Sequence, residues 1–150
     1  MDLYVYSRAL IERVTPHEVP HIIVSITSGA SDVARLPRTD MCLGILRLVF
    51  PDADAPSALY PPHALFNVSH ARQIWAFVLQ HRENVERVLV HCDAGLSRSP
   101  AVAAAIAPAL GVDPSDFTQG RYQPNRLVLR VLSEAASEFA ALGRPTSPLV

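Results

Sequence analysis

The residues with the clearest capacity for chemistry lie together at positions 91–100, which read His-Cys-Asp-Ala-Gly-Leu-Ser-Arg-Ser-Pro. They follow an apolar run typical of a strand at 87–90 and precede a run of helix formers at 101–106. Cys92 is therefore expected where a buried strand ends and a helix begins. The first N–H groups of a helix lack partners and carry partial positive charge, so an anion bound there is stabilised.

The loop that joins this strand to this helix is suited to a phosphate group. Gly95 allows a sharp turn, and successive backbone N–H groups of such a loop can form a nest for an anion. Arg98 offers a planar fork of donors that can hold two oxygens. The predicted phosphate-binding residues are Asp93, Ala94, Gly95, Leu96, Ser97 and Arg98.

The same positive field favours the thiolate form of Cys92, and a thiolate that faces a phosphate ester is an activated nucleophile. Ser99 can place its hydroxyl near the sulfur, or it can cap the helix with Pro100 at the first helical position. His91 is expected to orient the loop from beneath.

Five of these positions, His91, Cys92, Gly95, Arg98 and Ser99, match the signature His-Cys-x-x-Gly-x-x-Arg-Ser/Thr. The segment resembles the cysteine-dependent protein tyrosine phosphatase superfamily, and most of all its dual-specificity branch and bacterial relatives. The resemblance implies two-step hydrolysis of a phosphate monoester, in which Cys92 attacks phosphorus and water then hydrolyses the cysteinyl phosphate. It implies that Arg98 and the loop amides hold the oxygens, that Ser99 eases departure of the thiolate, and that neither metal nor other cofactor is needed.

Such a reaction gains about 100- to 10,000-fold from an acid that protonates the leaving oxygen. In the family this acid is an aspartate on a loop upstream of the cysteine. The longest irregular segment here, residues 51–62, follows a predicted strand and should lie at the carboxyl edge of the sheet. We expect Asp52 to be the acid, with Asp54 in reserve; the alternative is that both are solvated turn residues.

A second resemblance lies near the last predicted helix. Related phosphatases carry a Pro-Asn pair at the start of this helix, and that asparagine bonds the phosphate loop. Pro124-Asn125 is similar, so Asn125 is expected to support the loop. A plain helix cap is the alternative.

Strand-like and helix-like stretches alternate, which predicts a single-domain α/β fold with a mainly parallel central sheet flanked by helices. We expect one catalytic domain over residues 1–143 and a flexible tail over 144–150. The predicted strands are 3–6, 21–26, 42–50 and 87–91, and the predicted helices are 7–14, 63–80, 99–110, a short turn from 113, and 127–142. Pro108 should shorten the third helix, and Trp75 should belong to the core.

Composition favours an ordinary globular protein, since 49% of the 150 residues are hydrophobic, 18% are charged and the net charge is −1. This balance argues against a nucleic-acid or polyanionic membrane partner. The amino terminus does not resemble a signal peptide and no apolar run is long enough to span a bilayer, so we expect a cytoplasmic protein. We also expect a monomer. The histidines are scattered, which argues against a metal site. Cys42 is expected to be a buried strand residue. The alternative is that it forms a disulfide with Cys92 when the nucleophile is oxidised.

The expected substrate is a phosphorylated protein or peptide. Asp93 near the mouth of the loop would repel a highly anionic headgroup, which favours phosphotyrosine or phosphoserine/threonine over phosphoinositides. A small phosphorylated metabolite stays open. Two other classes also use an anion-binding loop of this kind, namely a rhodanese-type sulfurtransferase and a phospho-binding module without turnover.

Overall fold

A four-stranded, wholly parallel sheet forms the centre of the computed structural model, which describes residues 1–142. The strand order is β1-β4-β2-β3, and every neighbouring pair is parallel. The strands are β1 (Asp2–Ser7), β2 (His21–Thr27), β3 (Cys42–Val49) and β4 (Arg87–Cys92). The predicted α/β class is thereby confirmed. The predicted domain end at residue 143 and the predicted tail at 144–150 lie outside the described residues.

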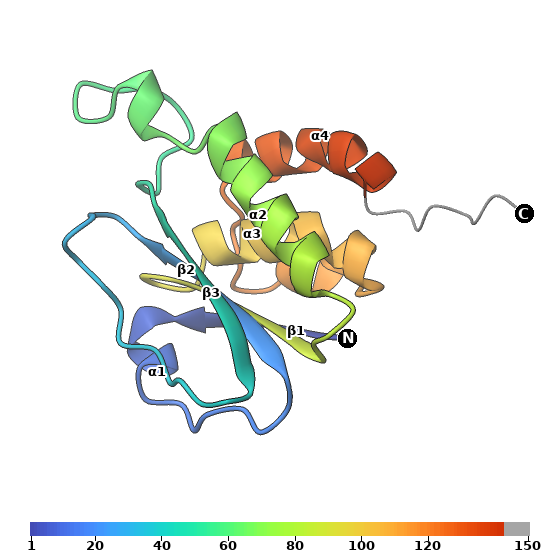
Figure 1. The fold of residues 1–150 in the computed structure, drawn as a ribbon. Helices are drawn as coiled ribbons and strands as arrows, with labels where there is room; N and C mark the ends of the chain where they lie inside the picture. The colour runs from blue at the N-terminus through green and yellow to red at the C-terminus, as the bar shows by residue number, and fades with distance from the viewer. Residues whose placement is uncertain (143–150) are drawn as a thin grey trace, which may run out of the picture.

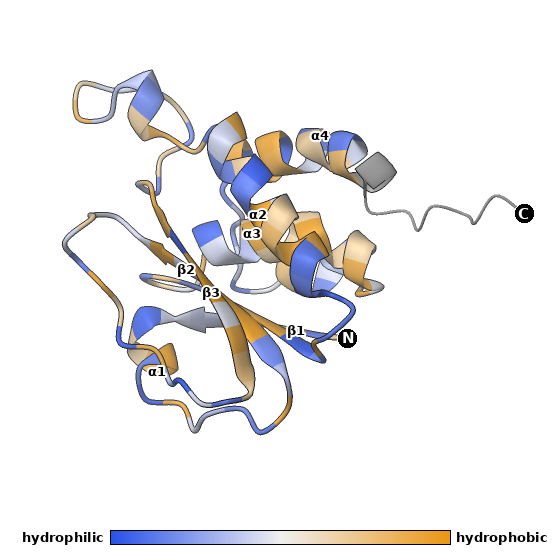
Figure 2. Cartoon of the chain, viewed as in Figure 1, coloured by the Kyte–Doolittle hydropathy of each residue, from blue (hydrophilic) through white to orange (hydrophobic). Residues whose placement is uncertain are grey.

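Helices cover both faces of this sheet. They are α1 (Arg8–Ile11), α2 (Val68–His81), α3 (Arg98–Ile106) and α4 (Arg126–Leu142), with 3₁₀ turns η1 (Pro62–Ala64), η2 (Ala107–Leu110) and η3 (Pro114–Phe117). Figure 1 shows α2, α3 and α4 together on one face and α1 on the other. In Figure 2, β2 and β4 are largely hydrophobic, whereas α2 and α4 alternate between hydrophobic and hydrophilic turns, as helices that cover a sheet should.

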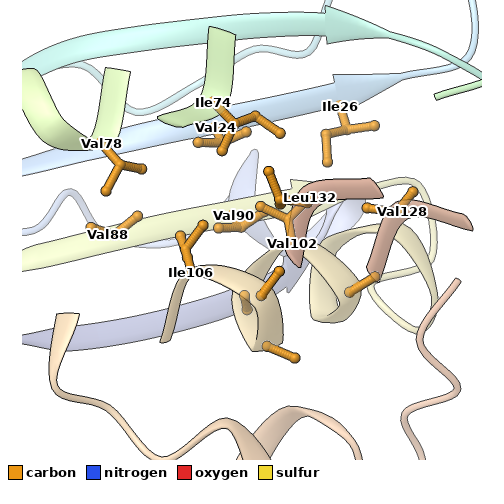
Figure 3. Close-up of a cluster of buried hydrophobic side chains, with 14 of the residues drawn as sticks. Val24, Ile26, Ile74, Val78, Val88, Val90, Val102, Ile106, Val128 and Leu132 are labelled. Carbon is orange, nitrogen blue, oxygen red and sulfur yellow. The ribbon is translucent and has the colours of Figure 1, made fainter. Parts of the chain in front are cut away.

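The core is divided by the sheet into a large and a small cluster. Because successive strand residues point to opposite faces, Val88 and Val90 join the large cluster under α2, α3 and α4, while Leu89 joins the small one with Ile11 and Ile23. Figure 3 shows Val88 and Val90 of β4 facing side chains from the helices of the large cluster. Both central strands are thus buried on two faces, which fixes their carboxyl ends firmly.

Trp75 belongs to the large cluster, as predicted, and is 3% exposed. Its indole N–H donates a hydrogen bond of 2.9 Å to the carbonyl oxygen of Leu132 in α4. The polar edge of this buried ring is therefore satisfied, and the bond fixes α2 against α4.

The helix expected over 63–80 begins later than predicted, at Val68. Asn67 caps it, because its side chain accepts from the Ser69 N–H while His70 Nδ1 accepts from the Asn67 N–H. This reciprocal capping fixes the start of the helix at Val68, and residues 62–64 form a separate 3₁₀ turn.

Two other helices are also shorter than expected. The one predicted over 7–14 is the single turn α1, capped as expected by Ser7. The one predicted over 99–110 ends at Ile106 and continues as η2, because Pro108 lacks an N–H group and its ring crowds the preceding turn. Within residues 1–142, none of the helices is both long and apolar enough to cross a membrane.

Candidate active site

The candidate site lies where β4 ends at Cys92 and α3 begins at Arg98. The side chain of Cys92 is buried, and three donor groups surround its sulfur. The N–H groups of Gly95 and Ser99 donate to Sγ at 3.3 and 3.4 Å, and Ser99 Oγ lies 3.1 Å away. Hydrogen bonds that converge on one sulfur stabilise negative charge there, which suits a thiolate nucleophile. Ser99 thus lies beside the sulfur, which was one of the two positions expected for it.

The loop can take this path only with glycine at position 95. Gly95 has a φ of 72°, in the left-handed region. A Cβ at this position would lie 2.7 Å from the backbone nitrogen of Ser7, at the end of β1. The Arg8 N–H also donates to the Asp93 carbonyl oxygen at 3.1 Å, so the loop rests directly on the β1–α1 junction.

Arg98 is almost completely buried, and its two terminal nitrogens are held by the protein. Nη1 donates to the Phe50 carbonyl oxygen and to Ser28 Oγ, both at 2.9 Å. Nη2 donates to Asp93 Oδ2, also at 2.9 Å. Nε is buried and has no partner among the described residues. A buried donor without an acceptor costs about 1–3 kcal/mol, so this N–H is a natural contact for an anion in the loop.

Asp93 is the counter-ion of this arginine. Its side chain is 45% exposed, while that of Arg98 is 5% exposed. Ser28 Oγ donates to the same carboxylate oxygen at 3.1 Å. Burial raises the pKa of Asp93, but the hydrogen bonds from Arg98 and Ser28 outweigh this effect, so the pKa lies below its usual value. A negative charge therefore lies at the mouth of the loop at neutral pH, as expected from the sequence, and it is in direct contact with Arg98.

His91 lies beneath the loop and is fully buried. Its Nε2 is 2.6 Å from Ser25 Oγ in β2, and its Nδ1 is 3.3 Å from the Cys92 carbonyl oxygen. Burial lowers the pKa of His91, so the imidazole is neutral at pH 7 and can donate at one nitrogen while it accepts at the other. The ring links β4 to β2 immediately below the nucleophile.

Asp52 adjoins the phosphate loop, whereas Asp54 lies farther along. Asp52 Oδ1 accepts from Ser97 Oγ at 2.8 Å and from Asn125 Nδ2 at 2.9 Å. Both aspartates line a polar surface hollow of about 590 Å³ that also includes Ser97 and Asn125. The structure therefore brings the first candidate acid, and not the reserve, into contact with the loop.

Asn125 combines the two roles that the sequence left open. Its backbone N–H donates to the Ser97 carbonyl oxygen at 3.0 Å, and its Oδ1 accepts from the Val128 N–H at the start of α4. Its amide nitrogen donates to Asp52 and to the Ala53 carbonyl oxygen. The side chain thus connects α4 to the segment of the candidate acid, and only the backbone contacts the loop.

Cys42 lies at the opposite end of the sheet from Cys92. It pairs in register with His21 at the start of β2, whereas His91, next to Cys92, pairs with Ser25. Four residues of strand separate these levels, about 13 Å at 3.3 Å per residue. A disulfide needs Cα atoms within about 7 Å, so the redox alternative for Cys42 does not fit the fold.

Sequence reasoning missed Ser25 and Ser28 as neighbours of the site. Both come from the end of β2 and the turn after it. The signal was available, because parallel strands bring their carboxyl ends to one edge, where polar residues after each strand meet. Among residues 1–142, no three His, Cys, Asp or Glu side chains are grouped as metal ligands.

No family model matches the sequence, and no curated protein matches it. Solved structures are similar to it over most of its length. Human DUSP28 is 17% identical and has a TM-score of 0.58, over 93% of this chain and 94% of that chain. PTPMT1, in complex with PI(5)P, is 20% identical with a TM-score of 0.52, over 84% of this chain and 81% of that one.

A third similar structure is the human tyrosine phosphatase-like serine/threonine/tyrosine-interacting protein, 22% identical with a TM-score of 0.52, over 81% of this chain and 79% of that one. At these identities the likeness concerns the fold. Combined with the strand–loop–helix arrangement around Cys92, it confirms the fold expected from the resemblance. The chain has the fold of the cysteine-dependent protein tyrosine phosphatase superfamily, in the compact form of its dual-specificity phosphatases.

Proposed function

We propose that this protein is a cysteine-dependent phosphatase that hydrolyses phosphate monoesters on phosphorylated proteins or peptides. The proposal rests on the hydrogen-bond donors that surround the sulfur of Cys92. Two backbone N–H groups and the Ser99 hydroxyl surround Cys92 Sγ, in the loop that also contains the buried, unpartnered Nε of Arg98. A thiolate and a free guanidinium donor in one anion-binding loop support in-line attack on a bound phosphoryl group.

In the first step, the Cys92 thiolate forms a bond to phosphorus as the bond from phosphorus to the leaving oxygen breaks. Arg98 Nε and the loop amides neutralise the charge on the three equatorial oxygens, so that no metal is required. Asp52 gives its proton to the leaving oxygen. Asp52 Oδ1 accepts the hydrogen bonds from Ser97 and Asn125, so in this mechanism Oδ2 is the oxygen that gives up the proton.

In the second step, water attacks the cysteinyl phosphate and the bond between sulfur and phosphorus breaks. Asp52, now ionised, takes the proton of the attacking water. The Ser99 hydroxyl, 3.1 Å from the sulfur, donates to the departing thiolate. Inorganic phosphate leaves, and the enzyme returns to its starting state.

The first test is hydrolysis of para-nitrophenyl phosphate with chelator and reductant present. We expect turnover by the native protein and none by Cys92→Ser, while Cys42→Ser, a matched control at the far end of the sheet, retains it. Absence of turnover by folded, reduced protein contradicts the proposal. In that case, thiocyanate formation from thiosulfate and cyanide identifies a sulfurtransferase, and phosphopeptide binding without turnover identifies a binding module.

The role of Asp52 is tested separately by varying the leaving group. We expect Asp52→Asn to lower kcat by about 100-fold or more for phenyl phosphate, and by less for para-nitrophenyl phosphate, whose leaving group needs less protonation. Asp54→Asn should have a much smaller effect. Equal losses for both esters would show that Asp52 only supports the loop.

For the substrate class, the ionised Asp93 beside Arg98 favours singly phosphorylated side chains over polyanionic headgroups. PTPMT1 binds PI(5)P in its crystal structure, which makes the phosphoinositide the relevant competitor. We expect higher kcat/KM for phosphotyrosine or phosphoserine/threonine peptides than for soluble PI(5)P. A higher kcat/KM for PI(5)P than for the peptides would indicate that the substrates are lipid phosphates.

A further inference from the structure

The first turns of α4 carry two arginines, Arg126 and Arg130, that the proposed mechanism does not use. Both are exposed, and their spacing of four residues places their Cβ atoms about 5–6 Å apart on one side of the helix. Neither guanidinium has an ion pair or side-chain hydrogen bond with another residue of the described chain. The pair is therefore available to a ligand.

Its own helix adds to the positive charge. Arg126 is the first residue of α4, and the first turn contains no acidic residue. The amino end of a helix carries partial positive charge and stabilises anions by about 0.3–1 kcal/mol, so a cation there is unfavourable by itself. Two arginines in this place create a positive field that the helix does not offset.

A second surface hollow connects the arginine pair with the candidate active site. It has a volume of about 410 Å³ and is lined by Asp54, Ala55, Arg126, Leu127 and Arg130. It shares Asp54 and Arg126 with the hollow that reaches Ser97 of the phosphate loop. The two hollows therefore adjoin each other along the start of α4.

The balance of charge changes along these hollows. Near the loop, Asp54 offsets Arg126, so the lining has no excess positive charge beside the general acid Asp52. Farther out, Arg126 and Arg130 outnumber Asp54, and the lining is positive. An acidic group of the substrate is therefore favoured at the far end.

We propose that Arg126 and Arg130 form a recognition subsite for an acidic side chain of the substrate, several residues away from the phosphorylated residue. This proposal rests on the proposed phosphatase function. Asn125 contacts Ser97 of the loop, and Arg130 lies five residues farther along the chain in α4, about 7.5 Å at 1.5 Å per residue. An extended peptide advances about 3.3 Å per residue, so two to five residues cover this distance and the reach of the arginine side chain. The arginine pair thus selects phosphorylated segments that carry an Asp or Glu at this distance.

The test uses phosphotyrosine peptides of alanine-rich sequence with one Glu placed at successive positions on either side. Binding is measured by fluorescence anisotropy with Cys92→Ser, so that no turnover interferes. We expect one Glu position, two to five residues away, to bind about two- to five-fold more tightly than the alanine peptide, as for an exposed ion pair. The gain should disappear in the Arg126→Ala/Arg130→Ala variant and shrink in high salt.

Two controls make the result specific. Arg38→Ala removes an exposed arginine that precedes β3, at the amino end of the sheet, and should retain the gain. Arg130→Glu should reverse the preference, so that Lys at the same peptide position binds more tightly than Glu. A purely structural role for Arg130 would not reverse the preference from Glu to Lys.

The subsite is overturned if no Glu position improves binding, or if the gain survives loss of both arginines. Either result leaves the phosphatase proposal intact as long as native protein hydrolyses para-nitrophenyl phosphate. Conversely, absence of that hydrolysis overturns the phosphatase proposal, whatever the peptide series shows.

Discussion

Each nitrogen of the Arg98 guanidinium has a different environment. Nη1 is fixed by Phe50 and Ser28, Nη2 is paired with Asp93, and Nε is buried without a partner. The first contact anchors the side chain, the second sets the charge at the mouth of the loop, and the third is left for the phosphoryl group. Asp93 therefore both orients the arginine and opposes the dianion that the arginine must bind.

This double role predicts opposite effects on binding and turnover for Asp93→Asn. Without the carboxylate, inorganic phosphate should inhibit about ten-fold more tightly, while kcat should fall because Nη2 is held less firmly. Since the pKa of Asp93 is lowered, its carboxylate stays ionised between pH 5 and 8, so the gain in affinity for the phosphate dianion should be the same across this range. Inhibition constants and kcat across this range provide the measurement, and an unchanged constant for phosphate would contradict the competing role.

At the scale of elements, the β4–loop–α3 unit depends on its close contact with the end of β1. Gly95→Ala adds a Cβ 2.7 Å from the Ser7 nitrogen, in a left-handed conformation that alanine adopts at a cost of about 1–2 kcal/mol. The loop must then move, which displaces the donors to Cys92 Sγ. We expect a loss of activity of at least about 100-fold, because misplacement by about 1 Å has this effect on catalysis.

Gly111→Ala is the matched control for this prediction. Gly111 has nearly the same φ, 70°, but nothing lies within 4 Å of its Cβ position. The Gly111→Ala variant should lose a similar amount of the free energy of unfolding, because alanine must adopt the same left-handed conformation, and its activity should be unchanged. Activity assays and thermal unfolding of both variants separate the two effects, and equal activity would show that the β1 contact does not matter.

Elements differ in how far the sequence predicted them. The strand, loop and helix around Cys92 are contiguous, so local patterning was sufficient for them. The predicted start of α2 was wrong, because its capping box pairs Asn67 with His70, and capping boxes usually have Glu or Gln at the second position. The contact of Ser28 with Asp93 and Arg98 joins positions 65 and 70 residues apart, which no local pattern contains.

At the scale of the whole molecule, three histidines couple stability to pH. Burial lowers the pKa of His17, His70 and His91, so the folded protein favours their neutral forms. The unfolded chain takes up these protons more readily. The contribution of these three histidines to the free energy of unfolding is therefore fully present above pH 6.5, the usual histidine pKa. It is lost as the pH falls from there through their lowered pKa values.

Thermal unfolding between pH 8 and pH 5 should accordingly show a midpoint that falls on the acidic side. His70→Gln should make this dependence shallower, because glutamine can still accept from the Asn67 N–H as a capping residue but does not titrate. His63→Gln, at an exposed position, should leave the slope as it is. Parallel curves for all three proteins would show that the half-buried His70 does not contribute.

The distance between the two cysteines determines how the protein responds to peroxide. The sequence contains only Cys42 and Cys92, and the sheet keeps them at opposite ends. A sulfenic acid on Cys92 consequently has no thiol of its own chain with which to condense. A disulfide that protects Cys92 therefore needs an external thiol such as glutathione, and further oxidation gives the sulfinic acid, which such thiols do not reverse.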